Sequence, residues 1–201
     1  MGHTGHTGTA RSRMEQISPG RSCCKVNLSV PVGATGFVLF AHGSGSSRHS
    51  PRNQFVARTI REAGVGTLLF DLLTQEEEAV DVSTRHLRFD IGLLAERLVD
   101  ATNWIKRETD TWHLRVGYFG SSTGGGAALV AAASVGEEIG SVVSGGGRPD
   151  FAGDALPKVK SPTLLIVGGL DYPVIRMNKG CVPPTRLRKG TENCSWGNAP
   201  L

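Results

Sequence analysis

Short apolar runs recur along the chain, and most of them end in glycine. Runs of this length and composition are typical of strands that are buried on both faces of a parallel sheet. The runs are residues 36–43 (GFVLFAHG), 66–73 (GTLLFDLL), 113–120 (HLRVGYFG), 141–147 (SVVSGGG) and 162–169 (PTLLIVGG).

Helical segments separate these runs. Residues 53–63 have the apolar spacing of a helix. Apolar residues that share one helical face predict a second helix over about residues 90–107. The small apolar residues 127–135 predict a third. The polar residues 74–86 predict a loop. Strands that alternate with helices predict an α/β protein with a mostly parallel, doubly wound sheet. Ligands of such sheets bind beyond the carboxyl ends of the strands, so we expect the functional site at the glycine-rich strand ends.

Composition divides the chain into three regions. Residues 1–24 are rich in Gly, Ser, Thr and Arg without apolar periodicity, so we expect a disordered leader, with Met14 as an alternative start. Residues 25–177 form the predicted α/β core. Residues 178–201 are rich in Gly, Pro, Asn and basic side chains, which predicts an irregular tail. We therefore expect the last strand and helix of the fold to be missing.

The charge and the cysteines narrow the choice of partners. The chain has 22 basic and 18 acidic residues, and a net charge of +4 does not indicate nucleic acid or a membrane as a partner. Cys23, Cys24, Cys181 and Cys194 lack the spacing of zinc ligands, which indicates reduced thiols. We expect no metal and no cofactor, since the sequence offers no cluster of ligands. Neither a transmembrane run nor a secretory signal is present, which predicts a cytoplasmic protein.

Residues Gly120-Ser121-Ser122-Thr123-Gly124 match the G-x-S-x-G pattern of a nucleophile elbow. In such an elbow, a sharp turn between a strand and a helix lifts the serine oxygen above the sheet, and the glycines prevent clashes. A flexible turn is the alternative, because this pattern is weak evidence in a chain rich in Gly and Ser. Its place between a predicted strand and a small-residue helix favours the elbow. Ser122 is therefore the candidate nucleophile.

A serine that attacks a carbonyl needs hydrogen-bond donors for the oxyanion that develops on the substrate. The backbone N–H of Thr123, directly after the nucleophile, is the first candidate. The N–H of Ser44 is the second, because His42-Gly43-Ser44 follows a predicted strand and has the small residues that close approach requires. We expect His42 to brace this loop, and proton transfer is its alternative role.

The acid of a catalytic triad is expected at the end of a later strand. Asp171 follows the apolar run 162–169, and the order of serine before aspartate is the one that the α/β-hydrolase fold uses. Asp150 and Asp154 are weaker rivals, and an ordinary turn aspartate is the other interpretation of Asp171.

The segments VLFAHGSGSSRHSPRNQFVA, GTLLFDLLTQEEE, GYFGSSTGGGAALVAAA and SPTLLIVGGLDYPV together resemble an α/β-hydrolase of the dienelactone hydrolase type, over about residues 26–177. The similarity is greatest to the small serine-bearing members, some of which are fused to phosphoribosyltransferase domains or occur beside them. The resemblance implies the α/β-hydrolase fold and a triad of nucleophile, acid and histidine. Dienelactone hydrolases proper have a cysteine nucleophile where this chain has Ser122, which argues against dienelactone as the substrate.

The triad histidine has no counterpart in this sequence. The family places it after the acid, whereas the histidines of this chain stand at positions 3, 6, 42, 49, 86 and 113. We hypothesise that a frameshift or coding error replaced the final strand, the histidine loop and the last helix. His49 and His86 are alternative bases, because both lie in loops predicted at the carboxyl side of the sheet.

The sequence therefore predicts a serine hydrolase that acts on a small-molecule ester, thioester or lactone through Ser122 and Asp171. Its turnover is expected to be impaired, because no histidine follows Asp171 to accept the serine proton. The alternative is a catalytically inactive hydrolase-like protein that acts as a binding module, or a frameshifted gene product. A missing last strand would leave an exposed sheet edge, through which we expect self-association. Nucleotide binding is disfavoured, because neither a P-loop nor a clear G-x-G-x-x-G motif is present.

Overall fold

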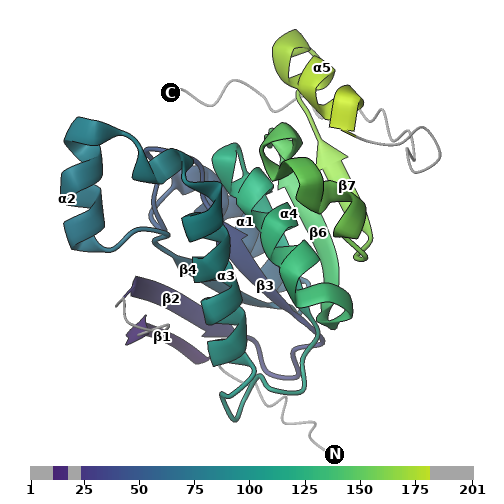
Figure 1. The fold of residues 1–201 in the computed structure, drawn as a ribbon. Coiled ribbons are helices and arrows are strands. Elements are labelled where there is room, and N and C mark those ends of the chain that lie inside the picture. The colour runs from purple at the N-terminus through teal and green to yellow at the C-terminus, as the bar shows by residue number, and fades with distance from the viewer. Residues whose placement is uncertain (1–10, 18–23, 182–201) are drawn as a thin grey trace, which may run out of the picture.

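A computed structural model describes residues 11–17 and 24–181 of the chain. Within these residues, seven strands form one mixed sheet in the order β1-β2-β4-β3-β5-β6-β7 (Figure 1). Neighbouring strands from β4 to β7 run parallel, whereas β2 is antiparallel to β4 and β1 is antiparallel to β2. The strands are β1 (Arg11–Ile17), β2 (Cys24–Val30), β3 (Phe37–Ala41), β4 (Gly66–Phe70), β5 (Val116–Ser121), β6 (Ile139–Gly145) and β7 (Thr163–Ile166).

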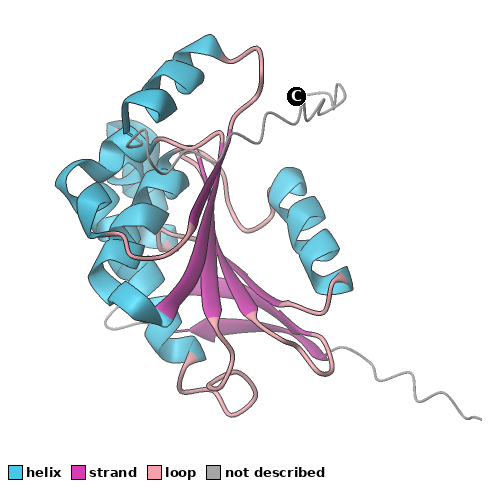
Figure 2. Cartoon of the chain, turned by 90° about the vertical axis from the view of Figure 1, so that its right-hand side faces the viewer, coloured by secondary structure: helices cyan, strands magenta, loops and turns pink. Residues whose placement is uncertain are grey.

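Helices cover both faces of the sheet (Figure 2). The α-helices are α1 (Pro51–Glu62), α2 (Gln75–Thr84), α3 (Ile91–Ile105), α4 (Thr123–Val135) and α5 (Tyr172–Cys181), and the 3-10 helices are η1 (Leu87–Phe89), η2 (Gly136–Glu138) and η3 (Pro149–Lys158). The prediction of a mostly parallel, doubly wound α/β fold is thereby confirmed.

The alternation of side chains along the central strands divides the core into two parts. Successive residues of a strand point to opposite faces of the sheet. Leu39 and Leu68 lie in the large apolar cluster to which α3 and α4 contribute, whereas their neighbours Phe40 and Leu69 lie in a small cluster with Ala57 of α1. Because both faces of β3 and β4 are covered, these strands read as continuous apolar runs.

The leader is more ordered than its composition predicts. Residues 11–17 form β1, which pairs antiparallel with β2 along its whole length, and β2 begins at Cys24. The prediction of a disordered leader is therefore wrong for residues 11–17 and 24, because the backbone of β2 offers a free edge that β1 extends. Residues 1–10 and 18–23 lie outside the described part of the chain.

The predicted loop over residues 74–86 is also wrong, because it contains helix α2. The helix begins with a capping box in which Thr74 Oγ1 accepts from the N–H of Glu77, and Glu77 Oε2 accepts from the N–H of Thr74 at 2.8 Å. Such a box satisfies two backbone donors that a helix start leaves without partners. Local capping therefore outweighs the weak apolar periodicity of this segment.

Strand β7 is the edge of the described sheet on the side away from β1. It lies near the end of the predicted core, residues 25–177. Its four residues are all at least partly exposed, and Leu164 is 53% exposed. Helix α5 continues to Cys181, so residues 178–181 are helical rather than an irregular tail. The rest of the predicted tail, residues 182–201, lies outside the described residues. Self-association through the β7 edge stays a prediction.

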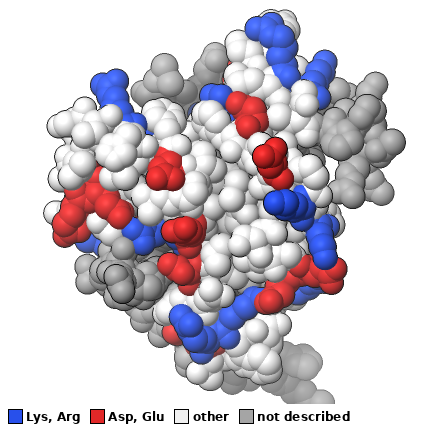
Figure 3. Space-filling view, viewed as in Figure 1, with Lys and Arg blue, Asp and Glu red and all other residues white. Residues whose placement is uncertain are grey.

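The surface seen in Figure 3 carries acidic and basic side chains next to one another rather than a field of one sign. Among the described residues, no helix has both the length and the apolar character that a membrane span requires.

Candidate active site

Ser122 connects β5 to α4 and has φ 50° and ψ −123°. An L-residue seldom adopts this conformation, because its side chain crowds the backbone, and such strain is concentrated at functional sites. Arg85 is the other non-glycine residue with a positive φ in the described part of the chain. A strained serine at a turn between strand and helix has the geometry of a nucleophile elbow. Residues 120–124 therefore form the strand–turn–helix junction that their pattern predicts.

The two glycines of the motif are sterically required. A Cβ on Gly124 would overlap the carbonyl oxygen of Ala41 at the end of β3, and a Cβ on Gly120 would overlap the carbonyl oxygen of Gly124. The elbow thus folds back onto its own strand and onto β3 without space for a side chain. This packing explains why the G-x-S-x-G spacing is needed here.

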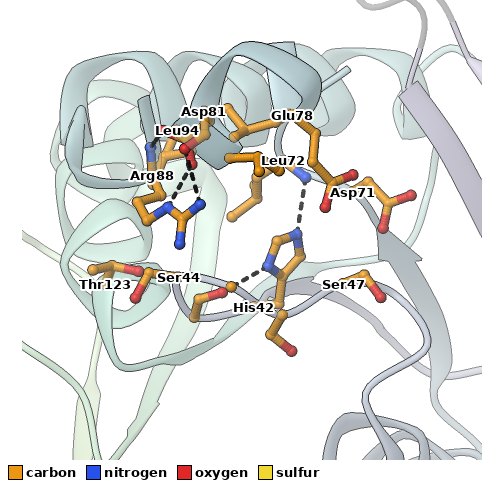
Figure 4. Close-up of a pocket in the computed structure, with 15 residues that line it drawn as sticks. His42, Ser44, Ser47, Asp71, Leu72, Glu78, Asp81, Arg88, Leu94 and Thr123 are labelled. Carbon is orange, nitrogen blue, oxygen red and sulfur yellow. Dashed lines mark hydrogen bonds and ion pairs between the residues drawn. The ribbon is translucent and has the colours of Figure 1, made fainter. Parts of the chain in front are cut away.

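The loop after β3 approaches the elbow closely. A Cβ on Gly43 would lie only 3.0 Å from Ser122 Cβ and 3.3 Å from the carbonyl oxygen of Ser121. Ser44 and Thr123 both line a pocket at the carboxyl ends of the strands (Figure 4). The remaining lining residues are His42, Gly43, Gly45, Ser46, Ser47, Asp71, Leu72, Leu73, Glu78, Asp81, Val82, Arg88 and Leu94. Ser122 is not among the lining residues, and it contacts the loop through Gly43. The structure thus places the predicted nucleophile beside the supporting loop, and both predicted oxyanion donors at the adjoining pocket.

Thr123 is the first residue of α4, where backbone N–H groups have no acceptor within the helix. Its side chain is 2% exposed, and its Oγ1 atom is buried without a hydrogen-bond partner among the described residues. Thr123 therefore carries two hydrogen-bond donors next to the candidate nucleophile, one from the backbone and one from the side chain.

His42 braces the loop, as predicted for its more favoured role. Its Nε2 atom accepts a 3.0 Å hydrogen bond from the N–H of Leu72, and its Nδ1 atom donates to the carbonyl oxygen of Gly43 at 2.9 Å. Burial lowers the pKa of His42, although the Gly43 carbonyl and nearby carboxylates act in the opposite direction. A neutral imidazole with both nitrogens engaged leaves no lone pair for the proton of Ser122.

The other described histidines are exposed. The N–H of His49 donates to Ser47 Oγ at 3.2 Å, His86 Nδ1 lies 2.8 Å from Thr84 Oγ1, and His113 contacts the ring of Trp112. No hydrogen bond joins Ser122 to an imidazole within residues 11–17 and 24–181. The structure therefore gives no support to His49 or His86 as a replacement base, and residues 3 and 6 lie outside the described part.

Asp171 stands between β7 and α5 and is exposed. Its Oδ1 atom accepts from the N–H of Val174 at 3.3 Å, which makes it an N-cap. Strand β6 separates β5 from β7, so the carboxyl ends of β5 and β7 lie about 10 Å apart. Contact between Asp171 and Ser122 would thus need a bridging group, which is the place of histidine in a triad. Among the described hydrogen bonds, none joins the two residues.

The rival acids have other surroundings. Asp150 accepts two short hydrogen bonds from the guanidinium of Arg148, and these bonds lower the pKa of Asp150. The backbone N–H of Arg148 donates to the carbonyl oxygen of Ser122 at 3.0 Å. The Arg148–Asp150 ion pair therefore belongs to a segment that is hydrogen-bonded to the backbone of the elbow. Asp154 is exposed. Neither acid lines the pocket.

The sequence did not predict that α2 and η1 form one side of the pocket, through Glu78, Asp81, Val82 and Arg88. Asp81, which is 2% exposed, accepts from the Arg88 side chain and from the N–H of Leu87, so the guanidinium is held in one orientation. Figure 4 shows the remaining guanidinium nitrogen of Arg88 directed towards Ser44 and Thr123. The capping box at residues 74–77 is the signal that could have identified this helix in the sequence.

The comparisons with known proteins agree with this architecture. No family model matches the chain. The crystal structure of a dienelactone hydrolase from Anabaena variabilis is 61% identical, with a TM-score of 0.84 over 89% of this chain and 82% of that one. A dienelactone-hydrolase-like promiscuous phosphotriesterase from metagenomic libraries is 16% identical, with a TM-score of 0.68 over 87% of this chain and 77% of that one, which shows likeness of fold alone.

Two proteins of Mycobacterium tuberculosis with the provisional name of phosphoribosyl transferase are 58% identical to this chain over 153 residues. The match covers 76% of this chain but only 34% of the length of these curated relatives. The chain therefore spans about a third of their length.

Proposed function

Because the chain belongs to the dienelactone hydrolase family of α/β-hydrolases, we propose that it is a serine hydrolase of small carboxylic esters, thioesters or lactones, with Ser122 as the nucleophile. The observation that carries this proposal is the conformation of Ser122, whose φ of 50° is tolerated at a junction of strand and helix. Strain of this kind persists only where the surrounding structure enforces it, and at an elbow it serves to expose the nucleophile.

In the proposed reaction, Ser122 Oγ attacks the carbonyl carbon of the substrate and an acyl-enzyme forms. The backbone N–H groups of Thr123 and Ser44 donate to the oxyanion, in a pocket that both residues line. The proton of Ser122 passes to water, and the leaving group takes a proton from water as it departs on collapse of the tetrahedral intermediate. A second water then hydrolyses the acyl-enzyme, which releases the acid and restores the Ser122 hydroxyl. Asp171 is the proposed acid of the site, at the end of the strand where this fold carries it.

Turnover is proposed to be slow, because His42 uses both ring nitrogens in the loop and the other described histidines are exposed. A serine hydroxyl is a weak nucleophile without an adjacent base. Loss of a triad member costs on the order of 10⁴ to 10⁶ in kcat, and oxyanion stabilisation accounts for the activity that remains. Covalent modification of Ser122 by an activated reagent is therefore the most sensitive readout.

The test is labelling with a fluorophosphonate probe, followed by mass spectrometry of the labelled peptide. We expect the wild type and Ser121→Ala to be labelled at Ser122, and Ser122→Ala to be unlabelled. Ser121 is the matched control, because its hydroxyl lies one residue away and donates to Asn53 Oδ1 at 3.4 Å. A folded wild type that stays unlabelled would overturn the proposal.

The second candidate function is a hydrolase-like protein that binds its ligand without turnover. It is favoured because the His42 imidazole is hydrogen-bonded to the backbone of Leu72 and does not act as a base for Ser122. It predicts that the wild type hydrolyses p-nitrophenyl esters no faster than Ser122→Ala, while carboxylic acids or esters still raise its melting temperature. Phosphoribosyl transfer, by contrast, is not proposed, because that name belongs to relatives about three times as long.

A further inference from the structure

The side chain of Thr123 is the part of the site that the proposed reaction leaves unused. Its Oγ1 atom is buried and has no partner among the described residues, although a buried hydroxyl without a hydrogen bond destabilises the folded state. Of the buried hydroxyls that lack a partner in the described part of the chain, those of Ser144 and Ser161 do not line the pocket, whereas Thr123 does.

Packing does not account for the hydroxyl. Thr123 begins α4 and is 2% exposed, and a valine would fill the same volume without an unsatisfied oxygen. The dihedral preferences of a helix start do not require threonine either, since the serine before it already occupies the capping position and makes no side-chain capping bond. The hydroxyl is thus maintained at a cost, on a residue that lines the pocket.

The general geometry of a threonine side chain suggests a partner for this hydroxyl. In a gauche rotamer, a threonine Oγ1 lies about 3 Å from the nitrogen of the same residue, so the O–H and the N–H can donate to one acceptor. Threonine has two favoured rotamers in helices, and the hydroxyl can therefore turn towards the pocket without a change in the backbone.

We propose that Thr123 Oγ1 is an additional oxyanion donor, which acts beside the backbone N–H groups of Thr123 and Ser44. This inference rests on the proposed function. As Ser122 Oγ bonds to the carbonyl carbon, the π electrons of the C=O bond move to the oxygen, and that oxygen accepts the hydrogen bond from Thr123. The proton of Ser122 passes to water, and Thr123 keeps its own proton throughout. Thr123 is therefore a catalytic residue through both its backbone and its side chain.

The experiment measures the second-order rate of labelling by a fluorophosphonate, in which the bond from Ser122 Oγ to phosphorus forms and fluoride leaves. We expect Thr123→Val to be labelled roughly 10- to 100-fold more slowly than the wild type, somewhat less than the loss measured for a full oxyanion donor. Thr123→Ser keeps the hydroxyl and should remain within about threefold of the wild type. Slow hydrolysis of a p-nitrophenyl ester should fall in kcat and not rise in KM.

Thr102→Val is the matched control, because the hydroxyl of Thr102 is buried and does have partners, in Leu98 and Tyr118. It should lower the melting temperature and leave the labelling rate unchanged, whereas Thr123→Val should keep or raise the melting temperature. If Thr123→Val unfolds, its hydroxyl has a structural role and the inference is overturned. Equal labelling of Thr123→Val and wild type overturns this inference alone. Absence of labelling in the folded wild type overturns the proposed function together with it.

Discussion

The Nε2 atom of His42 accepts a 3.0 Å hydrogen bond from the backbone N–H of Leu72. This bond ties the loop after β3 to the segment after β4, and the bond from Nδ1 to the carbonyl oxygen of Gly43 fixes the ring on its other side. The imidazole therefore positions the backbone of the loop that carries the second proposed oxyanion donor, and its proton lies on Nδ1.

His42 should make the stability of the protein fall at mildly acidic pH. Burial lowers its pKa in the folded state, whereas an unfolded histidine titrates near 6.5. As the pH falls below about 6.5, the unfolded chain binds a proton that the folded chain resists, so the free energy of unfolding decreases. Urea unfolding at pH 8 and pH 5.5 should show a smaller decrease for His42→Gln than for the wild type.

His113→Gln is the control for that measurement, because His113 is exposed and should leave the pH dependence as in the wild type. Equal pH dependence in His42→Gln and wild type would show that the buried imidazole is not the group that titrates.

Gly124→Ala should destabilise the protein by about 1–3 kcal/mol or more, because the new Cβ would overlap the backbone carbonyl of Ala41 and neither strand nor elbow can move freely. Gly140→Ala is the matched control on β6, where the nearest atom would lie at an ordinary 3.5 Å. Thermal unfolding of the two variants measures the difference. Similar melting temperatures would mean that the elbow is not closely packed against β3.

Tyr118→Phe should remove a loss of stability at alkaline pH. Burial raises the pKa of Tyr118 to about 12, although its hydrogen bond with Thr102 acts in the opposite direction. The neutral phenol is favoured in the folded state, so this contribution is complete below pH 10 and is lost as the pH rises towards 12. From pH 9 to pH 11, the wild type should lose about 1 kcal/mol more than Tyr118→Phe.

Tyr172→Phe is the control in the same urea titration, because Tyr172 is 61% exposed and should behave as the wild type does. A Tyr118→Phe variant with the wild-type alkaline profile would contradict the assignment.

Asp81→Asn should reduce the sensitivity of α2 to acid. Burial alone would raise the pKa of Asp81, but hydrogen bonds from the Arg88 side chain and from the backbone N–H groups of Arg88 and Leu87 lower it overall. A lowered pKa stabilises the folded state above about pH 4, and this contribution is lost as the pH falls further. The protection factors of residues 75–84 against hydrogen exchange should fall less in acid for Asp81→Asn than for the wild type, and Asp154→Asn serves as an exposed control.

The strands were the most predictable part of the fold, because burial on both faces leaves a signal in every residue. The run GTLLFDLL contains β4 and the run PTLLIVGG contains β7. Helix α2 escaped prediction for the opposite reason. Asp81 is its sole buried residue, so the helix has almost no apolar face, and its stability comes from a capping box and from ion pairs that span other segments. Similarly, β1 exists through pairing with β2 and carries no apolar pattern of its own.

The sequence by itself determined the fold class and the place of the candidate nucleophile, because strand burial and the steric need for Gly120 against Gly124 act through residues close together in the chain. Only the tertiary structure decided what His42 does, since its partner Leu72 lies 30 residues away. It also decided that Thr123, whose buried hydroxyl has no partner among the described residues, lines the pocket and that Asp171 lies two strands from Ser122. These three arrangements depend on which strands become neighbours in the sheet. Hydrogen bonds between distant segments leave no local pattern in the sequence that could predict them.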